Sequence, residues 1–267
     1  MQKIVKFIAT IILSALFLSG FAACGSDNKS TTTPPQEEPI TEPTQPQEEE
    51  PPLESAQLYE LRVYDVEPGQ MNASLAIFDE FFFDMFKDAG VTVVDFFVNF
   101  DESKIYYICA FDDAEAEEAA WDAFIGAFLE NPELIEAYPE PLNRDITVME
   151  RPDLANFSPT PASGPVYELR IYDVEPGQMD TSLAIFDEFF FDMFKDAGVT
   201  VVDFFVNFDD NKIYYICAFE STEAEEAAWD AFIGAFLENP ELIEAYPEPL
   251  NRDITVMERP DLINFSL

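Results

Sequence analysis

The chain has 267 residues, of which 54 are Asp or Glu and 13 are Lys or Arg, which gives a formal net charge of −41 at pH 7. A surface with this charge repels nucleic acid and anionic lipid headgroups, so we expect no direct binding to either. The sequence contains no histidine, which excludes histidine-based catalytic triads and histidine-ligated zinc or haem.

The chain begins with a predicted secretory signal peptide, residues 1–23. A basic start is followed by an apolar run at 8–18 and by small residues before Cys24. This ending resembles a bacterial lipobox, which implies that Cys24 is the lipidated first residue of the mature protein. Gly25 and Ser26 follow instead of Asp, so the resemblance implies anchoring in the outer membrane of the cell envelope. The alternatives are cleavage that leaves a free N-terminal cysteine, and a transmembrane anchor, for which the run is short.

The next segment, residues 24–57, is rich in Pro, Glu, Thr and Gln. Such a composition cannot bury enough apolar surface to offset the entropy cost of ordering. We therefore expect a disordered tether that holds the folded part away from the membrane.

The remainder consists of two repeats, predicted as domains 58–157 and 166–267. Positions 59–157 match 167–265 at a constant offset of 108, and nine of these 99 positions differ. The period indicates two structural units of about one hundred residues each.

Each repeat offers the same predicted elements in the same order. Hydrophobic periodicity and turn residues place them, in the first repeat, at 59–66 (strand), 70–89 (helix), 91–100 and 104–111 (strands), 115–128 (helix), 134–138 (helical turn) and 145–150 (strand). This βαββαβ order is typical of an α+β, ferredoxin-like unit with both helices on one face of an antiparallel sheet. The other face also carries apolar side chains and needs a cover. We therefore expect the two repeats to form an intramolecular pseudo-dimer whose sheets close a barrel.

The motif YELR-x-Y-x-x-x-PG, followed by IYYICAF and an acidic helix that contains Trp121, resembles the NIPSNAP family. The resemblance covers both repeats and implies the dimeric α/β-barrel fold. Glu117 and Glu118 stand where that family usually has an arginine. The wider superfamily includes cofactor-free monooxygenases and haem enzymes, so the resemblance implies a fold more specifically than an activity.

Strand alternation places Glu60, Arg62 and Tyr64 on one face of the first strand, opposite Tyr59 and Leu61. Because the apolar set suits the helix-covered side, we expect the polar set inside the barrel. The second repeat adds Glu168, Arg170 and Tyr172. Two interpretations are open: a site for a small anionic or polar ligand, or a paired Glu–Arg network that fixes how the two sheets meet.

Four other polar side chains are candidates for the same interior, although the strand phase there is ambiguous: Asp95, Asn99, Tyr106 and Tyr107. Cys109 and Cys217 are expected to be small buried hydrophobes; a disulfide is the alternative if the pseudo-twofold axis brings them together.

Three functional classes remain open on the sequence. We expect a binding or structural module on an outer-membrane lipoprotein, with no metal and no cofactor. The alternatives are a cofactor-independent monooxygenase-like enzyme acting on a small molecule in the barrel, and an adhesive module that works through divalent cations. The acidic run before the second helix is explained without a metal, because a helix N-terminus favours negative charge.

Overall fold

The computed structural model describes residues 57–160 and 164–265. The predicted signal peptide, the lipidation site Cys24 and all but the last residue of the tether lie outside these ranges. No helix among the described residues has the length and apolar character needed to span a membrane. In the first repeat the elements are β1 (Leu58–Asp65), α2 (Met71–Ile77), η1 (Phe78–Phe82), α3 (Phe83–Ala89), β2 (Thr92–Asn99), β3 (Lys104–Phe111), α4 (Ala114–Leu129), α5 (Pro132–Ala137) and β4 (Asn143–Glu150).

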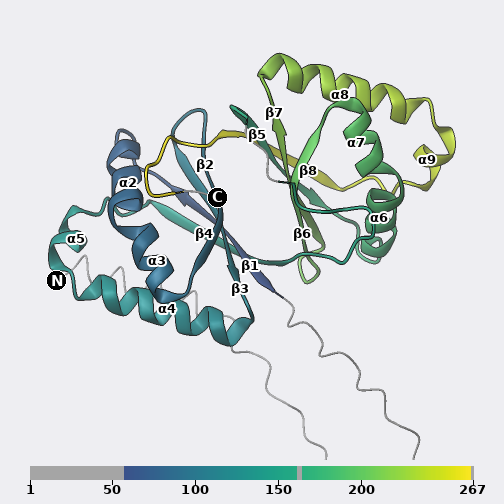
Figure 1. Ribbon diagram of the computed structural model, residues 1–267. Helices are drawn as coiled ribbons and strands as arrows, with labels where there is room; N and C mark the ends of the chain where they lie inside the picture. The colour runs from purple at the N-terminus through teal and green to yellow at the C-terminus, as the bar shows by residue number, and fades with distance from the viewer. Residues whose placement is uncertain (1–56, 161–163, 266–267) are drawn as a thin grey trace, which may run out of the picture. The chain divides into compact units, whose positions relative to one another are not determined.

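The second repeat has the same elements with nearly the same bounds (Figure 1). They are β5 (Val166–Asp173), α6 (Met179–Ile185), η2 (Phe186–Phe190), α7 (Phe191–Ala197), β6 (Thr200–Asn207), β7 (Lys212–Phe219), α8 (Thr222–Leu237), α9 (Pro240–Ala245) and β8 (Asn251–Glu258). The predicted element order is therefore confirmed.

The first predicted helix is continuous from α2 to α3 but contains a π-helical segment, η1, that the periodicity did not indicate. Phe78, Phe82 and Phe86, spaced four residues apart along this helix, form one buried aromatic cluster with ring centroids 5.1 to 6.3 Å apart. The helix ends at Gly90, whose φ of +92° is a left-handed conformation that favours glycine.

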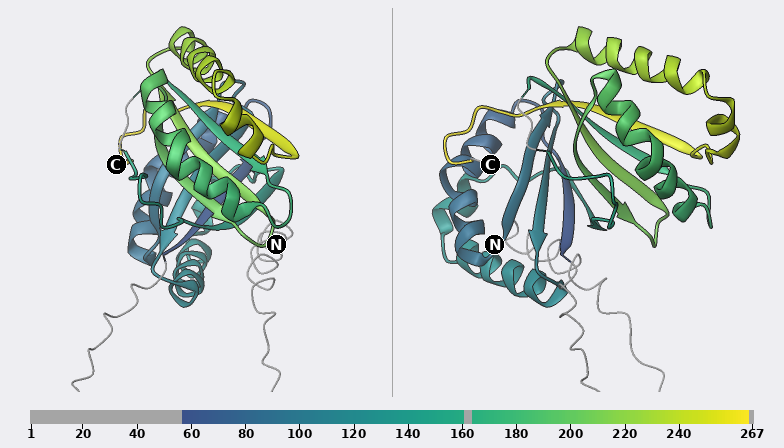
Figure 2. Two further views of the ribbon diagram at one scale, coloured as in Figure 1. Left: turned by 90° about the vertical axis from the view of Figure 1, so that its right-hand side faces the viewer. Right: turned by 45° about the vertical axis from the view of Figure 1, so that its right-hand side comes forward.

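The strands of both repeats close one barrel. Its order is β1-β3-β2-β8-β5-β7-β6-β4, and all pairs are antiparallel. The two seams between repeats are β2 with β8 and β4 with β6. Helices cover the outer side of each sheet, and the two sheets face each other (Figure 2). The fold is thus the predicted α+β pseudo-dimer with a closed barrel.

The inside of the barrel is an apolar core shared by the two repeats. Tyr59 lies against Phe205 with ring centroids 4.9 Å apart, and Phe97 lies against Tyr167 at the same distance. Leu61 belongs to the same buried cluster. The aromatic side chains on the inner face of each sheet are therefore buried against those of the other sheet. This burial explains why the two repeats pack together.

Candidate functional site

The candidate residues of β1 do not point into the barrel. The expectation for Glu60, Arg62 and Tyr64 was wrong in its choice of face, because Arg62 stacks on Trp121 of the covering helix α4. Tyr64 likewise contacts Phe78 of the helical layer, with ring centroids 6.5 Å apart. The same correction applies to Glu168, Arg170 and Tyr172, which lie beneath α8.

A carboxylate, a guanidinium and an indole meet beneath α4. Arg62 Nε and Nη2 each lie 2.8 Å from the same oxygen of Glu60. Trp121 Nε1 donates to that oxygen at 3.0 Å. The guanidinium carbon of Arg62 also lies 3.5 Å from the centre of the Trp121 ring, a close cation–π contact. Because Glu60 and Arg62 are both buried, these contacts offset the cost of removing two charges from water.

A second carboxyl group, from Glu117 on α4, joins this cluster. Burial is the main cause that raises the pKa of Glu117 to about 7; the charge of Glu60 and a hydrogen bond between the two carboxyl groups add to it. The negative charge of Glu60 repels a charge on Glu117, so the protonated form of Glu117 is favoured. Glu117 is therefore partly protonated at neutral pH.

Two phenols extend the cluster away from the carboxyl groups. Tyr107 donates a 2.6 Å hydrogen bond to the hydroxyl of Tyr64, which lies 3.4 Å from Arg62 Nη1. Burial raises the pKa of Tyr107 well above its ordinary value, and the neighbouring Tyr64 raises it further. The phenol of Tyr107 is therefore neutral near pH 7 and acts as a hydrogen-bond donor. We name the set of Glu60, Arg62, Tyr64, Tyr107, Glu117 and Trp121 the carboxyl–arginine cluster.

The second repeat carries an equivalent cluster. Arg170 Nε lies 2.7 Å from Glu168, Trp229 Nε1 donates to Glu168 at 2.9 Å, and the guanidinium carbon again lies 3.5 Å from the indole centre. Tyr215 donates to Tyr172 at 2.7 Å. Burial, followed by the hydrogen bond with Glu168, raises the pKa of Glu225 to about 7. The chain thus holds two matching proton-binding clusters.

The four other polar candidates are not brought together. Tyr106 faces the barrel core, while Tyr107 belongs to the carboxyl–arginine cluster. Asn99 stabilises the turn between β2 and β3, where its side-chain oxygen accepts from the backbone N–H groups of Ser103 and Lys104 at 3.0 and 2.8 Å. The barrel interior of the described residues is therefore a packed core at these positions.

The remaining candidate, Asp95, lies at a seam between the repeats. It sits at a β-bulge of β2 and accepts from Arg259 Nε and Nη2 at 3.1 and 2.6 Å. Burial raises the pKa of Asp95 to about 6, although Arg259 acts in the opposite direction. Asp203 and Arg151 form the matching pair at the other seam, with distances of 3.0 and 2.6 Å. These two pairs, which we name the seam ion pairs, connect the repeats.

After each seam arginine the chain crosses to the opposite repeat. Asn156 donates from its backbone to Asp187 Oδ1 at 2.7 Å, and Asn264 donates to Asp79 in the same way at the same distance. Phe157 packs on Phe191 with ring centroids 5.0 Å apart. We name residues 151–157 and 259–265 the crossover arms. Their sequence, RPDL-x-NF, is repeated, but the pattern indicated only the end of a strand.

Sequence reasoning also missed Glu117 and the indoles as members of the polar cluster. One signal was present, because the resemblance to the NIPSNAP family implies an arginine in the region where this chain has Glu117 and Glu118. Nothing local in the sequence indicates that Trp121 approaches Glu60, which is 61 residues away. Within the described ranges no three metal-ligating side chains gather into a metal site. Cys109 and Cys217 are buried, free thiols, and burial raises the pKa of each.

Solved structures with similar folds include NIPSNAP family proteins. One, from Agrobacterium tumefaciens, is 16% identical over 36% of this chain and 88% of its own, with a TM-score of 0.31. Over 76% of this chain, similar structures include a candidate monooxygenase from Lactobacillus acidophilus (13% identity, 93% of that chain, TM-score 0.48) and a variant chlorite dismutase from Candidatus Nitrospira defluvii (8% identity, 92% of that chain, TM-score 0.48). No family model and no curated protein matches the sequence.

Proposed function

We propose that this protein is a lipid-anchored envelope protein whose tandem α/β barrel acts as a binding or structural module. The observation that carries the proposal is the apolar packing of the barrel interior, where side chains of both repeats fill the space between the sheets. An interior that is filled in this way serves stability and leaves recognition to the outer surface.

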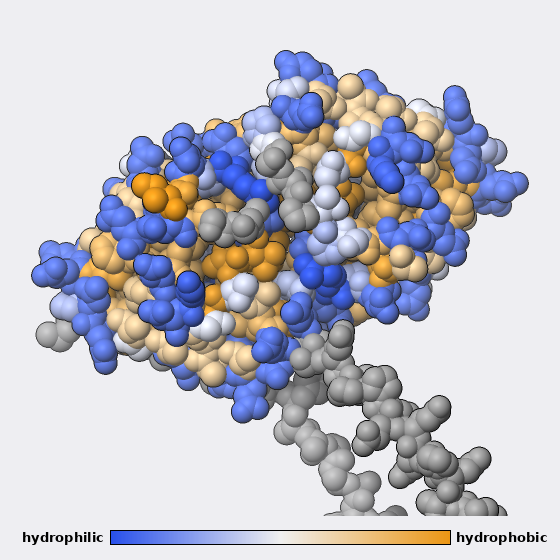
Figure 3. All heavy atoms as spheres, viewed as in Figure 1, coloured by the Kyte–Doolittle hydropathy of each residue, from blue (hydrophilic) through white to orange (hydrophobic). Residues whose placement is uncertain are grey.

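The outer surface suits a solvated module that stays away from anionic partners. Hydrophilic side chains are spread over the face seen in Figure 3, with apolar residues between them. The formal charge of −41 repels nucleic acid and anionic headgroups. Membrane attachment is therefore proposed through the lipid on Cys24 alone, with the outer membrane as the location.

Labelling with a fatty-acid probe tests the anchor. Cells that express the full chain are expected to show a labelled protein in the membrane fraction. A Cys24→Ala chain is expected to take up no label, because the modified sulfur is lost. Label on the Cys24→Ala chain, or none on the unaltered chain, would contradict the proposal.

The second candidate function is a cofactor-independent monooxygenase-like enzyme. One observation favours it: the carboxyl–arginine cluster combines a proton-binding carboxyl group, a guanidinium and two phenols at one buried place. Groups with shifted pKa values are common at catalytic sites, and also in structural networks.

Oxygen consumption by the purified chain with a panel of small phenols would distinguish the two functions. The binding or structural module predicts no substrate-dependent consumption. The enzyme predicts consumption that is lost when Arg62 and Arg170 are both replaced by Gln, while the melting temperature shows that the variant remains folded. Native mass spectrometry of the same preparation would reveal any small molecule that co-purifies.

A further inference from the structure

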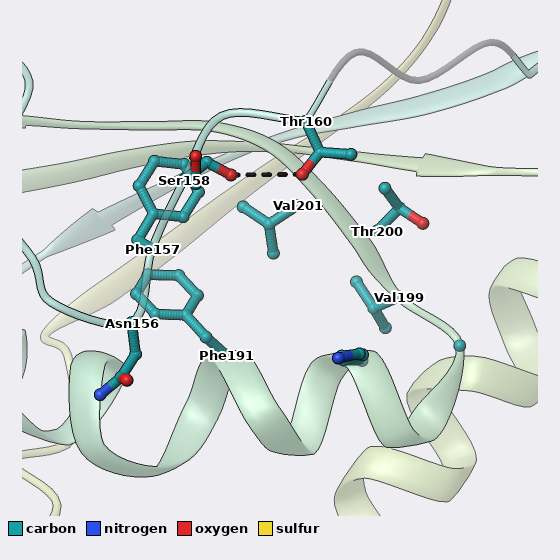
Figure 4. A pocket seen from close by; sticks show the side chains of 10 residues that line it. Asn156, Phe157, Ser158, Thr160, Phe191, Val199, Thr200 and Val201 are labelled. Atoms are coloured by element: carbon teal, nitrogen blue, oxygen red, sulfur yellow. Dashed lines mark hydrogen bonds between the residues drawn. The ribbon is translucent and has the colours of Figure 1, made fainter.

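The first crossover arm forms a pocket on the second repeat (Figure 4). The arm is fixed at Asn156 by Asp187, and beyond it Thr160 donates from its backbone to the carbonyl of Val202 at 3.1 Å. Thr160 Oγ1 also donates to the carbonyl of Ser158 at 3.2 Å. Between these two attachments the chain passes over α7 and β6, and a hollow of about 340 Å³ remains beneath it. This volume lies at the small end of the range typical of small-molecule sites.

The pocket has an apolar side and a polar rim. Phe157, Phe191 and Val199 contribute apolar surface, together with Val201. Figure 4 shows the two phenyl rings next to each other with the valines beside them. Covering such a surface with an apolar ligand body removes it from water, which stabilises a complex by about 25 cal/mol per Å².

The rim carries an ammonium group that is unusual in this chain. Ten Lys and Arg side chains fall within the described residues, and eight of them form ion pairs with Asp or Glu. Within those ranges the two without an ion pair are Lys87 and Lys195, at equivalent positions in the repeats. Lys195 lines the pocket. A cation left without an acidic partner in a protein with 54 acids is available to a ligand.

We propose that this pocket binds a small organic anion, specifically an aromatic or branched aliphatic carboxylate. The carboxylate pairs with Lys195, the hydroxyl groups of Ser158 and Thr200 at the rim can donate to it, and the apolar body covers Phe157 and Val201. The proposal rests on the proposed binding function and adds the class of ligand. Because the arm belongs to the first repeat and the lysine to the second, the site is built from both repeats.

The net charge of the chain opposes the approach of an anion, but only over a limited distance. At physiological ionic strength the Debye length is about 8 Å, so charges farther from the rim are largely screened. Direct contact with Lys195 is screened less. Binding is therefore expected to be measurable near physiological salt and weaker at low salt, where repulsion extends farther.

Fluorine NMR with trifluoromethyl-substituted benzoate tests the proposal on the full chain in non-ionic detergent, with detergent alone as the blank. Saturable broadening of the probe is expected. Lys195→Ala should weaken its affinity about twofold to fivefold, the range of an exposed ion pair, and Lys195→Arg should retain it. Lys87→Ala is the matched control and should bind like the unaltered chain. The corresponding benzyl alcohol, which lacks the charge, should bind more weakly.

Three results would overturn the proposal: no saturable binding, equal affinity in the Lys195→Ala chain, or the same loss in the Lys87→Ala chain, which would indicate a diffuse charge effect. Near-ultraviolet circular dichroism of each variant shows whether the fold is kept. A chain that is lipidated but binds no probe rejects the pocket and leaves the anchored module standing. Probe binding without lipidation rejects the anchor and leaves the pocket standing.

Discussion

The proton held by the carboxyl–arginine cluster should make the protein more stable in mild acid than at alkaline pH. Glu117 has a pKa of about 7 in the folded chain, against an ordinary value of 4.5. Because the pKa of Glu117 is higher in the folded chain than in the unfolded chain, protonation of Glu117 stabilises the folded chain. This stabilisation is complete below about pH 4.5 and is lost as the pH rises through 7. The difference between the two pKa values of Glu117 corresponds to at most about 3 kcal/mol in the free energy of unfolding. We expect a contribution of about 1 to 3 kcal/mol from this site.

The variant Glu117→Gln isolates this contribution from the other acids of the chain. Glutamine is neutral at every pH and can donate to Glu60 as the protonated carboxyl group does. At pH 8 the variant should be more stable than the unaltered chain by about 1 to 3 kcal/mol, whereas at pH 5 the two should be nearly equal. The assay is urea unfolding followed by tryptophan fluorescence, because Trp121 contacts the cluster.

The control is Glu118→Gln, which removes the charge of the neighbouring, exposed acid. Its effect should be small and should vary little between pH 5 and 8. If Glu117→Gln changes the free energy of unfolding equally at both pH values, Glu117 holds no proton in the folded chain at pH 5 to 8. Glu225→Gln should show the same trend with a smaller amplitude, because Glu225 is only partly buried.

Other consequences of the structure can be measured as well. Arg151→Ala should lower the free energy of unfolding by about 2 to 4 kcal/mol, because it leaves Asp203 buried without its partner; a second change, Asp203→Asn, should recover part of this loss in urea unfolding. A chain limited to residues 58–157 should form a homodimer in light-scattering chromatography, since its half of the barrel core would otherwise be exposed; a soluble monomer would contradict this. Cys109 and Cys217 should resist a thiol reagent in the native chain, and both should react with it after unfolding. If neither cysteine reacts after unfolding in the absence of a reductant, the two form a disulfide.

The order of elements and the closure into a barrel could be predicted because both depend on patterns spread along the chain. Period-two and period-3.6 spacing locate strands and helices, and the 108-residue offset supplies a second sheet. Asp113, a residue type favoured at helix N-termini, caps α4 by accepting a 2.8 Å hydrogen bond from the backbone N–H of Ala116. These features are local or repeated, so the sequence carries them directly.

The orientation of β1 could not be predicted in the same way, because both faces of a sheet in this fold are buried. Alternation separates Leu61 from Arg62 but does not say which one faces the helices. The choice depends on partners distant in sequence: Glu117 and Trp121, both on α4, satisfy the polar face of β1. Of the seam ion pairs, Asp95 and Arg259 are 164 residues apart and Arg151 and Asp203 are 52 apart, so neither pair follows from a local pattern.

The joining of both halves in one chain has an evolutionary consequence. In a homodimer every substitution appears twice, once in each subunit, so the two sides of the axis can never differ. Here a mutation changes one side only, and one such difference already reaches the edge of the barrel core, where Val63 corresponds to Ile171. The presence of both halves in one chain therefore releases this barrel from exact symmetry, and its two sides are free to acquire different specificities.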